Sequence, residues 1–274
     1  MKKFKMAIAA LMLMTLAAMN VGCDEMPTAG GGSSYSHYDL PQGMGYVDLG
    51  LPSGTLWCTR NLGATKAIDP GRYYAWGEVL CKNFTEHYAW DTYKYGSGTN
   101  ALTKYCYDFP DAPWLHYGLN GYVDDLRELE RGDDAASSTF GDHYVTPTPE
   151  QFQELMDNTT HKWIEIQSDN DNEVSGMEFT GKNGNQIFLP AGSSCNEETP
   201  LADYGLVHPD NLGKVGNYWT RSLCCSSSYD EAIHGGGAPC CARSFQFFEK
   251  DHGVMCVNWY DRSMGLNVRP VYVP

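Results

Sequence analysis

The sequence predicts an α+β fold in which short helices accompany a small, mostly antiparallel sheet. The clearest helix signal is at Thr148, which is followed by Pro149 and, three positions on, by Gln151, the arrangement of a capping box. Short runs of strand-forming residues then follow between 163 and 189, separated by polar turns. Short helices followed by many short strands are typical of the α+β class.

Composition limits the class of protein and its partners. With 274 residues, of which 42% are hydrophobic and 19% charged, the chain is globular and long enough to bury a sizeable core. The net charge of −15 would repel the phosphate backbone of DNA or RNA, so we expect no nucleic-acid partner.

Residues 1–22 are expected to form a lipoprotein signal peptide. A basic start precedes the apolar segment 7–18, which is too short for a comfortable transmembrane helix. The leader peptide ends at Val21 and Gly22, just before Cys23. These three residues resemble a lipobox, whose cysteine thiol receives a diacylglycerol. Asn20 departs from that motif, which usually has Leu there, and an ordinary secretory signal with an incidental cysteine is the alternative.

The residues after Cys23 indicate where the protein resides. Asp24 and Glu25 resemble the acidic tag that directs Bacteroidetes lipoproteins to the outer face of the outer membrane. We therefore expect a lipid-anchored protein exposed at the cell surface that touches the membrane only through its anchor. Residues 23–43 contain much Gly, Ser and Pro and are expected to be a flexible tether, so the folded domain should span 44–274.

Local patterns predict the elements of this domain. A hairpin is expected from 46–49 and 55–60, a third strand at 72–79, and a short amphipathic helix at 123–129. Segment 81–122 is rich in aromatic rings, which could stack on sugars or cover the core, and we favour the core.

The elements from Thr148 onward have stronger signals. The helix that begins there should bury Phe152, Leu155 and Met156. The strands that follow are predicted at 163–166, 177–180 and 186–189.

The C-terminal stretch 216–273 has strand-forming ends around a chemically varied middle. That middle, the window 224–263, contains half of the ten cysteines: Cys224, Cys225, Cys240, Cys241 and Cys256. Regular ends that frame an irregular middle are typical of a scaffold that presents a binding surface.

The two ends of this stretch also resemble a known family. The matching residues are Tyr218, Trp219, Thr220, Arg221 and Ser222, and Val268, Arg269, Pro270 and Val271. They are similar to the closing signatures of the Fibrobacter major paralogous domain, and further matches lie at 47–54, 61–65, 74–78, 133–136, 147–155 and 183–190. The resemblance implies a C-type-lectin-like fold and a surface lipoprotein of the kind abundant in gut Bacteroidetes.

Metal and cofactor sites are not expected. The acidic segment 169–173 lacks the spacing of a calcium loop and is taken as a solvated turn. The Glu-Pro-Asn and Trp-Asn-Asp motifs of calcium-dependent sugar-binding lectins do not occur. The pairs Cys224–Cys225 and Cys240–Cys241 lack the Cys-x-x-Cys spacing of zinc sites.

An enzyme is not expected, because the histidines are scattered and form no recognised catalytic motif. Formylglycine-generating oxidases share the broader lectin-like fold and use paired cysteines, so such an oxidase, with Cys240 and Cys256, is a minor alternative.

The window also resembles the variable region of diversity-generating retroelement proteins. Changes at the adenines of Asn codons can yield Cys, Ser, Phe, His, Tyr and Asp, which occur here. The window also contains Glu231, Gln246 and Met255, which such changes cannot produce, so diversification stays open.

We expect a non-catalytic surface module that binds an extracellular protein or a carbohydrate through this window. The candidate aromatic anchors are Trp259, Tyr260, Phe247 and Phe248. Alternatively, strand alternation places Phe245, Phe247 and Trp259 in the core, which leaves Phe248, His252, Tyr260 and Asp261 as the better exposed candidates. The alternative is a structural or pilus-tip assembly subunit. The candidate ligand-binding residues are Tyr229, Arg243, Phe248, His252, Trp259, Tyr260, Asp261 and Arg262.

Overall fold

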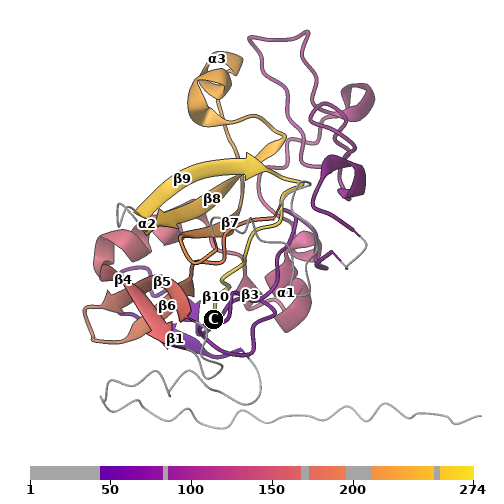
Figure 1. Ribbon diagram of the computed structural model, residues 1–274. Helices are drawn as coiled ribbons and strands as arrows, with labels where there is room; N and C mark the ends of the chain where they lie inside the picture. Colours follow the sequence, from indigo (N-terminus) through magenta and orange to yellow (C-terminus); the bar gives the residue numbers. More distant parts are fainter. Residues whose placement is uncertain (1–43, 83–85, 168–172, 196–211, 250–253) are drawn as a thin grey trace, which may run out of the picture. The chain divides into compact units, whose positions relative to one another are not determined.

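Three small antiparallel sheets and several short helices make up the described part of the chain (Figure 1). The computed structural model describes residues 44–82, 86–167, 173–195, 212–249 and 254–274, with backbone only at 254–257. These residues belong to one compact unit of the chain, Ser34–Pro274. The predicted signal peptide, the tether and Cys23 lie outside the described residues.

The first sheet joins the beginning of the domain to its end. The predicted hairpin is confirmed as β1 (Tyr46–Asp48) paired with β2 (Leu56–Cys58). Strand β10 (Val271–Tyr272) pairs with β2 on one side and with β3 (Tyr144–Val145) on the other. The N-terminal hairpin and the C-terminal strand of the domain therefore lie in one sheet.

The second sheet contains the three strands predicted after the helix. They are β4 (Thr159–Gln167), β5 (Glu173–Gly181) and β6 (Gln186–Pro190), and each pairs antiparallel with the next. All three predictions are confirmed, although β4 and β5 are longer than their sequence signals. The acidic segment 169–173 lies outside the described residues except for Glu173.

The third sheet carries the C-terminal window. Strand β7 (Val215–Leu223) pairs with β8 (Cys241–Phe248), which pairs with β9 (Val254–Asp261). Between β7 and β8 lie the short helix α3 (Tyr229–Glu231) and the turn η5 (Ala232–Gly236).

Helix α2 (Pro149–Asn158) begins at the predicted capping box. The Gln151 N–H donates to the Thr148 hydroxyl at 3.2 Å, and the Thr148 N–H donates to the Gln151 side chain at 2.9 Å. Phe152 and Leu155 are buried as predicted, and Met156 is partly buried against the same cluster. The Phe152 ring stacks on Phe245 of β8, with 4.5 Å between centroids, so α2 packs against the third sheet.

The remaining helical pieces are short. Helix α1 (Ala135–Phe140) is capped by Asp134, whose carboxylate accepts from the Ala136 N–H at 2.9 Å. Single 3-10 turns are η2 (Trp90–Thr92), η3 (Leu119–Gly121) and η4 (Arg131–Asp133).

Two predicted elements are wrong. The predicted strand at 72–79 makes only an isolated bridge, between Tyr74 and Leu266, and a turn closed by the Glu78 N–H and the Ala75 carbonyl at 3.0 Å ends the extended run. The predicted helix at 123–129 does not form, because Asp125 has φ 53° and the Leu129 N–H donates to Arg221 of β7 at 2.8 Å.

Strand β7 contributes to the two larger of three hydrophobic clusters among the described residues. Trp219 packs with Trp76, Tyr105, Tyr107 and Phe109, which confirms that much of the aromatic segment covers the core. Tyr218 belongs to the other cluster, with Trp57 and the α2 residue Phe152. The combination of short helices and antiparallel sheets confirms the α+β class. No helix among the described residues has the length and apolar character needed to cross a membrane.

Candidate binding surface at the C-terminal window

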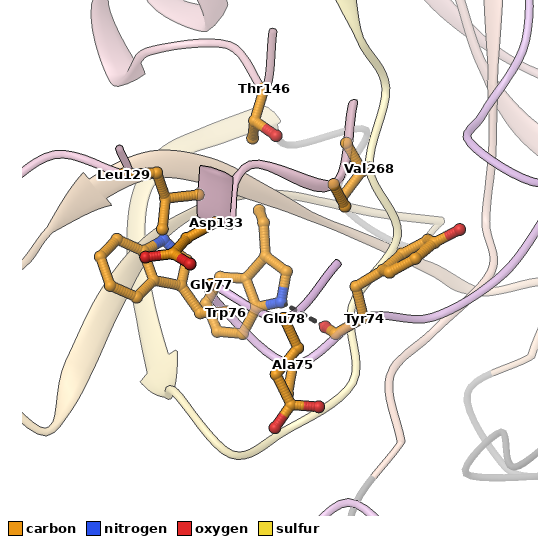
Figure 2. A pocket seen from close by; sticks show the side chains of 11 residues that line it. Tyr74, Ala75, Trp76, Gly77, Glu78, Leu129, Asp133, Thr146 and Val268 are labelled. Atoms are coloured by element: carbon orange, nitrogen blue, oxygen red, sulfur yellow. Dashed lines mark hydrogen bonds between the residues drawn. The ribbon is translucent and has the colours of Figure 1, made fainter. Parts of the chain in front are cut away.

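The residues that carry the family resemblance are scaffold residues. The indole N–H of Trp219 donates to the Tyr74 carbonyl at 2.7 Å, and that of Trp76 donates to the Thr220 carbonyl at 2.9 Å. Figure 2 shows the small hollow beside them, which Leu129 and Asp133 also line. Its volume of about 10 Å³ is room for one water at most, so this hollow is no ligand site.

Arg269 has a similar structural role. Its guanidinium is fully buried and donates to the Asn61 side chain at 2.8 Å, to the Cys58 carbonyl at 3.0 Å and to the Phe188 carbonyl at 2.7 Å. Since Cys58 lies in β2 and Phe188 in β6, this side chain links two sheets.

Arg262 is not part of an exposed surface, contrary to what a ligand contact at this residue requires. The side chain is fully buried, and it donates to the carbonyls of Tyr105 at 2.8 Å, Pro239 at 3.1 Å and Lys104 at 2.9 Å. It therefore fastens the aromatic segment to the end of β9.

The exposure of Trp259 and Tyr260 is the reverse of what strand alternation predicted. Trp259 is 39% exposed, whereas Tyr260 is half-buried and its hydroxyl accepts from Gln246 at 2.6 Å and donates to Asn217 at 3.3 Å. A register shift between Ser244 and Gln246 in the β8–β9 pairing places an extra residue in β9. This bulge lies between Met255 and Asn258, so Trp259, which pairs with Arg243, still shares the face of Phe245 and Phe247. The two phenylalanines are buried as expected, whereas Trp259 is exposed despite its phase.

The other candidates are partly covered. Tyr229, Arg243, Phe248 and Asp261 are half-buried, and His252 lies outside the described residues. Tyr229 packs against Phe109 with 6.1 Å between ring centroids. The structure therefore does not gather the predicted set into one open patch.

Exposed apolar side chains lie on two parts of the chain, the aromatic segment and the C-terminal window, and apart from Trp259 the sequence did not single them out as candidate contacts. Ile233 of η5 is 58% exposed, and the Trp259 indole N–H donates to the carbonyl of Gly235 in the same turn at 3.2 Å. Trp114 in the aromatic segment is 74% exposed, and Leu119 and Tyr122 are exposed as well. We call Trp114, Leu119, Tyr122, Ile233 and Trp259 the exposed apolar set. No sequence pattern distinguishes Trp114 and Tyr122 from the buried aromatic residues of the same segment.

Direct contacts tie the two segments together. The Asp111 carboxylate accepts from the Tyr229 N–H at 2.8 Å and from the Asp230 N–H at 3.4 Å, and the first bond lowers the pKa of Asp111 below its usual range. The Tyr107 hydroxyl donates to the Cys224 carbonyl at 2.6 Å. These hydrogen bonds therefore join the aromatic segment to the window.

The window also contains a group of buried thiols. Cys224, Cys240 and Cys241 pack together, whereas Cys225 is exposed, and all four are free. The Cys240 and Cys241 sulfurs are 3.8 Å apart, and Cys241 lies 3.5 Å from the Asp261 carboxylate. The hydrogen bond with Cys240 and burial raise the pKa of the Cys241 thiol. The side chain of Cys256 lies outside the described residues.

A further hollow of about 230 Å³ is lined by residues outside the window, namely Arg131, Asp142, His143, Val145, Arg221, Val273 and Pro274. Its guanidinium groups are engaged by acids: Arg131 pairs with Asp142 at 3.0 Å and Arg221 with Glu128 at 3.2 Å. The hollow therefore offers no free cation to an anionic ligand.

Comparisons with protein-family models, with curated proteins and with solved structures found no match to this chain.

Proposed function

We propose that this protein is a non-catalytic surface lipoprotein whose C-type-lectin-like domain binds an extracellular protein or carbohydrate through the exposed apolar set. The observation that carries the proposal is the exposure of Trp114 and Trp259 on two segments that Asp111 joins. Large rigid aromatic side chains dominate recognition surfaces, because they bury much area at little entropic cost.

The scaffold supports the same proposal. Buried groups such as Arg262 and Tyr107 fix the aromatic segment to the third sheet. A supported loop loses less conformational entropy when it binds than a free loop would. The paired β2 and β10 and the antiparallel sheets are compatible with a lectin-like architecture. Diversification of the window stays a prediction.

The first prediction concerns the two exposed indoles. We expect Trp114→Ala and Trp259→Ala each to weaken ligand binding by at least tenfold, about 1.4 kcal/mol, because each removes a large contact side chain. The mature chain carrying Cys23→Ser to prevent lipidation would be tested on a glycan array and in protein pull-downs, and affinities measured on the ligand found.

Leu212→Ala is the matched control, since Leu212 is an exposed apolar residue outside the exposed apolar set. It should bind as the parent chain does. A ligand that binds all three variants equally would show that the contact surface lies elsewhere. Capture of subunits of a surface fibre, with no glycan bound, would favour the assembly-subunit alternative.

A further inference from the structure

The buried thiols form an unusual donor group at the end of the β8–β9 hairpin. The sulfurs of Cys240 and Cys241 and one carboxylate oxygen of Asp261 all lie within 4.8 Å of one another. Cys241 and Asp261 are direct partners in the register of the two strands, so the sheet itself brings the third donor to the pair.

The spacing of these donors fits a tetrahedral zinc ion. With Zn–S bonds of about 2.3 Å and a Zn–O bond of about 2.1 Å, tetrahedral angles place two sulfurs about 3.8 Å apart and a sulfur about 3.6 Å from an oxygen. The observed separations are 3.8 Å between the sulfurs and 3.5 Å from the Cys241 sulfur to Asp261. Both of these edges match, and the third, from the Cys240 sulfur to the Asp261 carboxylate, is no longer than 4.8 Å.

The local backbone explains how adjacent cysteines can face one point. Successive residues of a regular strand point to opposite faces, but Cys240 lies just before β8 and only Cys241 belongs to the strand. The Cys241 N–H donates to the Ala238 carbonyl at 2.8 Å, and the Arg262 N–H donates to the Cys240 carbonyl at 3.0 Å. These bonds hold the corner that turns the two sulfurs together.

The surroundings suit a bound cation as well. Cys240 and Cys241 are buried, which protects metal–sulfur bonds, while the half-buried Asp261 leaves one side open to solvent. Two thiolates and one carboxylate around Zn²⁺ leave one net negative charge, and the buried Arg262 guanidinium interacts electrostatically with Cys240. Soft thiolate ligands favour zinc over magnesium or calcium.

We propose that Cys240, Cys241 and Asp261 bind one zinc ion, with water as the fourth ligand. Binding releases one proton from each thiol, because zinc binds cysteine as the thiolate. The ion fastens the start of β8 to the end of β9. The proposal is independent of any ligand of the exposed apolar set.

Cobalt(II) is the probe that tests this site, because tetrahedral thiolate coordination gives near-ultraviolet charge-transfer and strong visible bands. The mature chain with Cys23→Ser, reduced and freed of metal, should bind one equivalent of cobalt with both bands, and zinc should displace it. Cys240→Ser and Cys241→Ser should abolish the charge-transfer band of the site, and Asp261→Asn should weaken binding by at least tenfold.

Cys225→Ser is the matched control, because Cys225 is an exposed thiol beside the same cluster. It should bind cobalt as the parent does. Asp261→Asn keeps a half-buried polar side chain, so it tests the site even where the buried cysteine variants fold poorly. A parent chain without the bands, a Cys225→Ser loss equal to that of Cys240→Ser, or unchanged affinity in Asp261→Asn would overturn the proposal.

Discussion

Buried charged residues stabilise this fold at several points, and Asp133 is the clearest example. Its carboxylate accepts hydrogen bonds from the Tyr95 and Tyr105 hydroxyls and from the Lys104 ammonium group, the last at 2.6 Å. Burial opposes ionisation, but these bonds outweigh it and hold the pKa of Asp133 at about 2 instead of the usual 3.8. The folded state therefore binds this proton less readily than the unfolded state does.

The sign of the resulting pH dependence follows from that comparison. A carboxyl group with a lowered pKa stabilises the fold fully above its unfolded value of 3.8, and this stabilisation is lost as pH falls from there through about 2. We predict that Asp133→Asn lowers the free energy of unfolding by about 3 kcal/mol near neutral pH, because the Tyr95 and Tyr105 hydroxyls lose a charged acceptor and Lys104 keeps only the more exposed Glu130 as a partner. Urea titrations at several pH values measure both effects.

Asp142→Asn is the control for that experiment, since Asp142 forms an exposed ion pair with Arg131. Exposed pairs contribute little, so its unfolding curve should follow the parent. Equal losses in the two variants, or an Asp133→Asn variant that keeps the parent's acid sensitivity between pH 3.8 and about 2, would contradict the role of Asp133.

Arginine burial was the main error at the level of single residues. Arg262 was expected to contact ligand, because arginine is rarely fully buried and sequence gives no measure of burial. Its acceptors, the carbonyls of Lys104, Tyr105 and Pro239, lie far from it in sequence. No local pattern could have shown that they meet.

Elements were predictable where local signals determine them. The capping box at Thr148 and the strands β4, β5 and β6 depend on residues close together in the chain. The predicted helix at 123–129 does not form because its backbone N–H groups have other acceptors. The Leu129 N–H donates to Arg221 of β7 at 2.8 Å, and the Leu126 N–H donates to the Asp124 carboxylate at 3.1 Å. The bulge between β8 and β9 likewise has no signal in either strand alone.

The cap of α2 gives a prediction at the level of the element. Thr148→Ala removes the hydroxyl that accepts from the Gln151 N–H, and we expect a loss of about 1 kcal/mol in the free energy of unfolding. Urea unfolding at neutral pH measures the change. Gln153→Ala alters an exposed residue on the same helix and should stay within about 0.5 kcal/mol of the parent. A Thr148→Ala variant as stable as Gln153→Ala would show that the cap contributes nothing.

At the scale of the whole molecule, the sequence predicted the fold class but not the arrangement of the candidate sites. The α+β class follows from the order of local elements. By contrast, the exposed apolar set depends on the contact between Asp111 and Tyr229, and the donor group depends on the pairing of Cys241 with Asp261. The absence of Cys-x-x-Cys spacing around Cys240 and Cys241 argued against zinc. The pairing of β8 with β9, however, brings Asp261 to these sulfurs as a third donor, and sequence spacing cannot reveal that contact.

Anchoring to the outer membrane is the last prediction, and it depends on Val21, Gly22 and Cys23. A diacylglycerol on Cys23 would bury two acyl chains, at about 0.8 kcal/mol for each CH₂ group, which is enough for stable attachment. We expect Cys23→Ala to move the protein from the membrane fraction to the soluble fraction, whereas Cys225→Ala should leave it in the membrane. Protease added to intact cells should digest the wild-type protein. If it is spared there and digested only after lysis, the lipoprotein faces the periplasm and the proposed capture of extracellular ligands fails.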